Sequence, residues 1–230
     1  MVVAMHMSDG LVNAPTSLAF GLFAVLVLAV AVSRARADLD DRTAPMAGLV
    51  TAFVFAVQMI NFPILPGASG HLLGGALVAI LVGPWVGTLC IAIVLLVQGV
   101  LFADGGLTAL GMNITNMAIV GVFTGYLVAR SLRWLAQRSR GGLLAVAFIA
   151  AFVNTVVASL AFVLEYALGG AGGASLGTVF ALMVGLHALI GVGEGLITAA
   201  TVGAVAGTRP DLIYLLRQPA RGHAVAGRAS

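Results

Sequence analysis

The sequence predicts an all-α polytopic membrane protein, a bundle of seven transmembrane helices with the N-terminus outside and the C-terminus in the cytoplasm. Hydrophobic residues make up 61% of the 230 residues and charged residues only 8%, whereas a soluble domain carries about 25% charged residues. The mean hydropathy is +1.13. The apolar residues gather into seven runs, and a helix needs about 20 of them to cross a bilayer. We therefore expect a multi-pass protein of the cell membrane.

Each predicted span is bounded by residues that break a helix or carry charge. The first run ends in the charged stretch SRARADLDDR, and the second ends at the helix breakers of NFPILPG. The third run follows PGASG and is short, at about a dozen residues. Glycine-rich loops follow the fourth and sixth runs, a basic loop follows the fifth, and an arginine-rich tail follows the seventh. The seven predicted spans are 18–32, 44–62, 71–82, 84–102, 112–129, 143–168 and 179–206.

The arginines indicate that the short third run is a true crossing. With seven spans, every arginine falls on one side of the membrane: after the first span, after the fifth span or in the tail. Six spans would place the first two groups on opposite sides. Because basic loops stay in the cytoplasm, the arginine side is predicted to be cytoplasmic. The three groups are Arg34, Arg36 and Arg42, then Arg130, Arg133, Arg138 and Arg140, then Arg209, Arg217, Arg221 and Arg228.

Several function classes are excluded by composition. The chain has no lysine, so it can form neither a P-loop nor a Schiff-base site; any ATP would have to be hydrolysed by another polypeptide. A net charge of +3 on so apolar a chain is too small for a nucleic-acid-binding face. The single cysteine, Cys90, is interpreted as a small core residue. We also expect no cleaved signal peptide, since no basic segment and cleavage site flank the first run.

Ionisable groups within or at the edge of a membrane are costly, so each is a functional candidate. Four of them are predicted at outer span ends or in outer loops: His6, Asp9, His71 and Asp104. For His71 the alternative is an interfacial histidine bonded to a neighbouring carbonyl.

Two further ionisable residues lie within the last span. His187 and Glu194 are seven residues apart and share a helix face, which favours a structural polar network with other helices over direct metal ligation by His187. Amides near span ends are interpreted as interhelical hydrogen-bonding groups, some of which could orient an imidazole. They are Gln58, Asn61, Gln98, Asn113, Asn116 and Asn154. His223 lies in the polar tail and is expected to be solvated.

The first residues, MVVAMHMSDGL, contain two candidate starts. If the chain begins at Met5, its free amine, the deprotonated backbone nitrogen of His6 and the His6 imidazole can wrap one metal ion in fused chelate rings. Three nitrogens in one plane leave a fourth position, which His71 can fill. Planar nitrogen sites suit Ni²⁺ and Cu²⁺, and low-spin Co²⁺ can also use one. If the chain begins at Met1, His6 is too far from the amine and the segment is a frayed tail.

Four motifs, taken in order, resemble the CbiM/NikM family of cobalt and nickel transport components. They are MHMSDG, PGASGHLLGGAL, QGVLFADGGLTALGMNITNMAIVG and HALIGVGEG, and the resemblance covers residues 5–206. The family consists of substrate-binding membrane subunits (S components) of energy-coupling factor transporters. The resemblance implies seven transmembrane helices and a metal held by Met5, His6 and His71. It also implies that residues 1–4 are an N-terminal extension outside the true start, followed by one transmembrane domain (5–207) and a cytoplasmic polar tail (208–230).

The resemblance further implies the protein's cargo and partners. The transported ion would be Ni²⁺ or Co²⁺, with no resident cofactor and no enzymatic activity. A transmembrane coupling subunit and two ATP-binding-cassette ATPases would drive uptake, with a small accessory membrane subunit as a further partner. The rival interpretations are a vitamin-binding S component, a secondary transporter and an intramembrane metalloenzyme. The last is disfavoured because the sequence has neither an HExxH nor a GxSxG motif.

Overall fold

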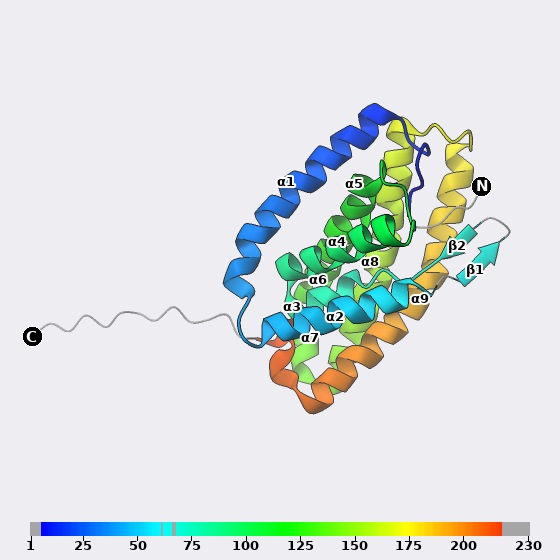
Figure 1. The fold of residues 1–230 in the computed structure, drawn as a ribbon. Coiled ribbons are helices and arrows are strands. Elements are labelled where there is room, and N and C mark those ends of the chain that lie inside the picture. The colour runs from blue at the N-terminus through cyan, green and yellow to red at the C-terminus, as the bar shows by residue number, and fades with distance from the viewer. Residues whose placement is uncertain (1–5, 61, 66–67, 218–230) are drawn as a thin grey trace, which may run out of the picture.

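The structure, a computed structural model, describes residues 6–60, 62–65 and 68–217. For residues 62–65 and 68–70 it describes the backbone only. It is a bundle of helices with one small β-hairpin (Figure 1). The helices are α1 (Ala14–Asp38), α2 (Thr43–Gln58), α3 (Gly75–Val82), α4 (Pro84–Leu101), α5 (Leu110–Asn113), the π-helix η1 (Ile114–Gly121), α6 (Val122–Ser131), α7 (Arg133–Arg138), α8 (Arg140–Gly169), α9 (Leu176–Thr208) and the 3₁₀ turns η2 (Pro210–Leu212) and η3 (Tyr214–Leu216). The strands β1 (Phe62–Leu65) and β2 (Ala68–Gly70) pair antiparallel.

Five helical rods in the described part of the chain are long and apolar enough to cross a membrane. Each coincides with a predicted span, so the prediction of an all-helical membrane protein is confirmed. The predicted fifth span is one continuous rod in which α5 passes through η1 into α6. The helix α2 corresponds to the second predicted span and is somewhat shorter, at 16 residues. The five rods are Ala14–Asp38, Pro84–Leu101, Leu110–Ser131, Arg140–Gly169 and Leu176–Thr208.

Polar side chains fix where three of these helices begin. The Asn13 side chain accepts a hydrogen bond from Thr16 N at the start of α1. The Ser139 and Ser175 hydroxyls do the same at the starts of α8 and α9. The first backbone N–H groups of a helix have no partner within it, so an oxygen at this position stabilises each helix start.

Two predicted span boundaries are wrong. The second span was expected to run to residue 62, but α2 ends at Gln58 and Phe62 belongs to β1. The third was expected to be helical from His71, but α3 begins at Gly75. Gly74 adopts φ +78, a left-handed conformation that stops the helix from extending backwards. Residues 71–74 therefore lie outside the helix, without regular secondary structure.

The third predicted span contains only the short helix α3, whose eight residues cover about 12 Å. Every residue of α3 is buried, and Figure 1 shows it inside the bundle among α2, α4, α6 and α8. A helix that is apolar all round suits this central position.

The outer helices are arranged very differently around this core. The α8–α9 pair forms a long antiparallel hairpin in which Gly191 and Gly195 lie against Phe152 and Phe148. In contrast, α1 lies along one flank (Figure 1), with most of its apolar side chains exposed. A span this exposed is suited to contact with lipid or with another membrane protein.

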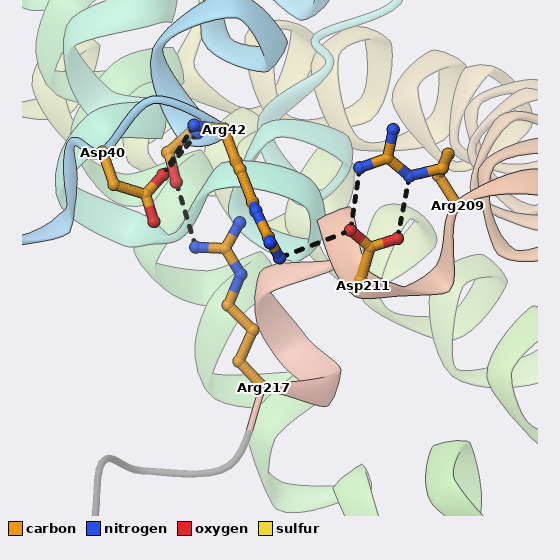
Figure 2. Close-up of polar contacts among 6 residues, drawn as sticks. Asp40, Arg42, Arg209, Asp211 and Arg217 are labelled. Carbon is orange, nitrogen blue, oxygen red and sulfur yellow. Dashed lines mark hydrogen bonds and ion pairs between the residues drawn. The ribbon is translucent and has the colours of Figure 1, made fainter.

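One end of the bundle gathers arginines from distant segments (Figure 2). Asp211 pairs with Arg209 and lies 3.7 Å from Arg42, at the start of α2. The Arg217 guanidinium donates to the Thr43 hydroxyl. The carboxylate of Asp40 accepts a hydrogen bond from the Thr43 N–H, which lowers the pKa of Asp40 to about 2. These contacts hold residues 210–217 against the bundle, where Ile213 and Leu215 are buried.

Candidate metal centre

The opposite end of the bundle holds the N-terminal segment against the loop that follows α4. The Asn113 side chain makes two hydrogen bonds to the backbone of Met7. Its oxygen accepts from Met7 N at 2.7 Å, and its amide nitrogen donates to Met7 O at 3.2 Å. Met7 O also accepts a hydrogen bond from Gly106 N. A side chain on Gly106 would lie 2.3 Å from Asp9 N, so glycine is needed for this approach. The position of His6 is therefore defined by its neighbour.

The two predicted histidines meet at this end. His6 and His71 are 65 residues apart in sequence, yet their ring centroids are 4.5 Å apart with a tilt of 39°. Both are buried, with 5% of His6 and none of His71 exposed.

Hydrogen bonds at Nδ1 fix the orientation of both rings. His71 Nδ1 lies 2.9 Å from Leu72 O, and His6 Nδ1 lies 3.1 Å from an oxygen of Asp104. Carbonyl and carboxylate oxygens only accept, so in each ring Nδ1 carries the proton and Nε2 is left as the basic nitrogen. Both Nε2 atoms are buried and have no hydrogen-bond partner among the described residues. Buried polar atoms are normally bonded, and neutral imidazole nitrogens are common metal ligands.

The acidic residues at this end have distinct roles. Asp104 faces the His6 ring, and that hydrogen bond lowers the pKa of the Asp104 carboxyl. Asp9 instead accepts from the Thr108 hydroxyl and from Thr108 N, and these bonds lower its pKa. Asp9 therefore anchors the N-terminal segment, whereas Asp104 places negative charge beside the two histidines.

The interpretation of His187 and Glu194 as one polar network is right for Glu194 only. Glu194 binds the backbone of residues 73–74 and two side chains of α8. His187 Nδ1 lies 2.6 Å from Met183 O in its own helix, and its Nε2 has no partner in the described chain. The two residues share a helix face, but no hydrogen bond joins them.

One buried carboxylate was missed in the sequence. Glu165 on α8 is 1% exposed and accepts a hydrogen bond from Asn116 Nδ2 at 2.7 Å. The signal was available, since it is a lone charge in the apolar run AFVLEYALG. The pairing of Asp104 with His6 was also not predicted, although both residues were candidates.

Met5 and Asn61 lie outside the described residues, as do residues 1–4 and His223. Within residues 6–60, 62–65 and 68–217, no three His, Cys, Asp or Glu side chains are grouped so as to hold a metal ion. The described site thus offers two imidazoles. Any further nitrogen ligands have to be backbone atoms or come from residues beyond those described.

A multi-pass helical bundle with two buried imidazoles packed together at one end points to a class of protein: a membrane component of metal-ion transport. Residues 6–212 match the family described as CbiM, cobalt uptake substrate-specific transmembrane region. The chain belongs to the CbiM family. This is a family of transport components and not of enzymes, so the metalloenzyme interpretation is set aside.

Relatives are described as transporters of both metals. The chain is 39% identical over 217 residues to a "Putative fused nickel transport protein NikMN" of Archaeoglobus fulgidus, covering 94% of this chain and 70% of that protein. It is 31% identical to a "Cobalt transport protein CbiM" of Sorangium cellulosum, covering 93% and 96%. A crystal structure titled as a truncated transition metal transporter superposes with a TM-score of 0.77 at 26% identity, covering 88% of this chain and 98% of that one. Cobalt or nickel transport is thus the shared property.

Proposed function

We propose that this protein is the substrate-binding subunit of an energy-coupling factor transporter and captures Ni²⁺ or Co²⁺ on the outer side of the membrane. The observation that carries the proposal is the pair of buried histidines, His6 and His71, whose ring centroids lie 4.5 Å apart and whose Nε2 atoms have no hydrogen-bond partner among the described residues. Two buried imidazoles this close together suit a cation better than an organic vitamin, which needs a larger lined cavity.

The proposed site combines these histidines with the start of the chain. In a protein that begins at Met5, the terminal amine, the backbone nitrogen of His6 and the His6 imidazole supply three nitrogens, and His71 Nε2 supplies the fourth. Only Nδ1 of an imidazole can close a six-membered ring with the backbone nitrogen of its own residue. Metal binding therefore requires the His6 ring to leave Asp104 and turn about its Cβ–Cγ bond. On this proposal residues 1–4 are absent from the working protein, 5–207 form the transport domain and 208–230 follow it.

The proposed topology has seven crossings, with the metal site outside and the arginine end in the cytoplasm. It is supported by the opposite placement of the two ends: the segment after α8 pairs with residues 11–12 near the histidines, whereas Arg42, Arg209 and Arg217 gather at the other end.

Cysteine labelling tests this topology. In a Cys90→Ala background, Ala171→Cys should react with an impermeant maleimide in intact cells, because residue 171 lies at the histidine end. Gln137→Cys, in the arginine-bearing loop, should react only after the membrane is opened. Both positions are exposed, so accessibility within the protein is matched. Labelling of residue 137 from outside would overturn the orientation.

The proposed partners supply the ATP hydrolysis that this chain lacks the residues for. A P-loop contacts nucleotide phosphates through a lysine, and the sequence contains no lysine. We propose that a transmembrane coupling subunit and two ATP-binding-cassette ATPases energise uptake, with a small accessory membrane subunit completing the complex.

The experiment that tests the function has a binding step and a transport step. Purified protein beginning at Met5 should bind Ni²⁺ or Co²⁺ with 1:1 stoichiometry in calorimetric titration. In proteoliposomes, ATP-dependent uptake should occur only when the coupling subunit and ATPases are included. Absence of binding to both metals would refute the proposal, and ATP-driven uptake by this chain alone would refute the partner assignment.

A further inference from the structure

The segment that carries His71 is held by side chains and not by regular secondary structure. Residues 71–74 connect β2 to α3 without regular secondary structure, and all four are buried. Leu73 O accepts a hydrogen bond from Gln58 Nε2 of α2 at 2.6 Å, and Leu73 N donates to a Glu194 oxygen of α9 at 2.7 Å. Buried backbone groups need partners, and here two different helices supply them.

Glu194 is the centre of this arrangement. Its Oε2 accepts from Leu73 N at 2.7 Å and from Thr155 Oγ1 at 3.0 Å, and its Oε1 accepts from Gly74 N and Asn154 Nδ2, both at 3.0 Å. Each oxygen therefore binds one backbone N–H of the His71 segment and one side chain of α8. The two backbone N–H groups and the Asn154 amide can only donate, and the Thr155 hydroxyl has one hydrogen to give either to Glu194 or to Ala151 O at 2.9 Å. A carboxylate satisfies these donors, whereas a glutamine, which replaces one acceptor with a donor group, does not.

Two glycines allow the segment to come this close. Gly74 has φ +78, and a Cβ there would lie 2.8 Å from Val54. At Gly75 a Cβ would lie 2.6 Å from Asn154 Oδ1. The hydrogen bonds from Leu73 and Gly74 to Glu194 thus depend on glycine, which has no side chain, at positions 74 and 75.

The same hydrogen bonds also affect the His71 imidazole. Glu194 fixes the N–H groups of Leu73 and Gly74, and the carbonyl of Leu72 belongs to the same peptide unit as Leu73 N. That carbonyl accepts a hydrogen bond from His71 Nδ1 at 2.9 Å, which fixes the ring and leaves Nε2 as its basic nitrogen. Bonds of this kind to the non-ligating nitrogen orient metal-binding imidazoles.

We propose that Glu194 is a positioning residue for metal capture: through the Leu72–Gly74 backbone it fixes the orientation of the His71 imidazole. The inference rests on the proposed function, since it needs His71 to be a ligand. It links the core of the α8–α9 hairpin to a site formed by the N-terminal segment and the segment before α3.

The test compares two buried carboxylates in protein beginning at Met5. Glu194→Gln should weaken Ni²⁺ or Co²⁺ binding by about 10- to 100-fold, the usual cost of losing an outer partner, and should shift the d–d spectrum toward that of His71→Ala. Glu165→Gln is the matched control, because Glu165 is equally buried but bonds Asn116, and its binding and spectrum should stay at wild-type values. Thr155→Val removes one donor from Glu194 and should give a smaller loss in the same direction, which serves if Glu194→Gln does not fold.

A double mutant separates positioning from general destabilisation. If Glu194 acts through His71, adding Glu194→Gln to His71→Ala should cost little more affinity than His71→Ala alone. Additive losses, or a folded Glu194→Gln or Thr155→Val protein with wild-type affinity and spectrum, would overturn the inference. Failure of the wild-type protein to bind either metal would instead refute the proposed function, and the inference with it.

Discussion

A protein that begins at Met5 is expected to bind nickel more than about 100-fold more tightly than the same protein with MVVA retained ahead of it. Any residue before Met5 turns its amine into an amide, which removes one ligand and separates the chelate from the true terminus. Losing an outer-shell partner of a metal ligand costs up to about 100-fold, and losing a direct ligand together with a chelate ring should cost more. From Met5 onward every side chain is identical in the two proteins, so the comparison isolates the Met5 amine.

The measurement is a pair of calorimetric titrations with Ni²⁺ and Co²⁺, with intact mass confirming each N-terminus. A protein that begins at Met5 with its terminal amine acetylated is a useful third sample, since acetylation blocks the amine without adding a residue. Equal, tight binding by all three forms would mean that the histidines act through their side chains alone, for example through their two buried Nε2 atoms, which have no hydrogen-bond partner among the described residues.

Replacement of His6 by alanine is expected to be at least as damaging as the extension, and more damaging than His71→Ala. His6 contributes its imidazole to the fused rings, whereas His71 fills a single position, so His71→Ala should leave a three-nitrogen remnant with weaker binding and an altered d–d spectrum. Binding should also weaken at acid pH, because the amine and both imidazoles bind metal only when unprotonated. Titrations of both variants between pH 5 and pH 8 test the order of the two variants and the loss of affinity in acid.

His187→Ala separates two interpretations that the sequence left open. If His187 is a structural residue of α9, its removal should leave the metal spectrum unchanged. If it is a ligand, the spectrum should change as it does for His71→Ala. The bond from its Nδ1 to Met183 O and the absence of a three-residue metal cluster among the described residues favour the first result.

Much of the fold was predictable because the bilayer restricts it so strongly. Apolar runs between charged or glycine-rich loops located the five long rods to within a few residues. The starts of α1, α8 and α9 carry Asn13, Ser139 and Ser175, which are ordinary helix-capping residues. The boundaries near residues 59–74 could not be predicted. The side chains of Gln58 and Glu194 bind the backbone of residues 73–74, and local sequence does not show such tertiary bonds.

The sequence singles out the two histidines, but it does not show which groups hold them. His6 and His71 stand out as rare ionisable groups at span ends, and the structure brings their rings to 4.5 Å. The partner of each ring was not accessible from spacing, since Asp104 is 98 residues from His6. The anchoring of Leu73 by Glu194 spans 121 residues. Both depend on how the spans pack, which hydrophobic periodicity alone does not determine.

The central claim, a planar nitrogen site made by the amine of Met5 with His6 and His71, is tested most directly by X-ray absorption at the nickel edge. The sample is the purified protein beginning at Met5, loaded with one equivalent of Ni²⁺, with His71→Ala measured beside it. We predict four nitrogen neighbours in a square-planar arrangement, scattering from two imidazoles in the wild type and from one in the variant. A six-coordinate site dominated by oxygen, or identical spectra for the two proteins, would contradict the account.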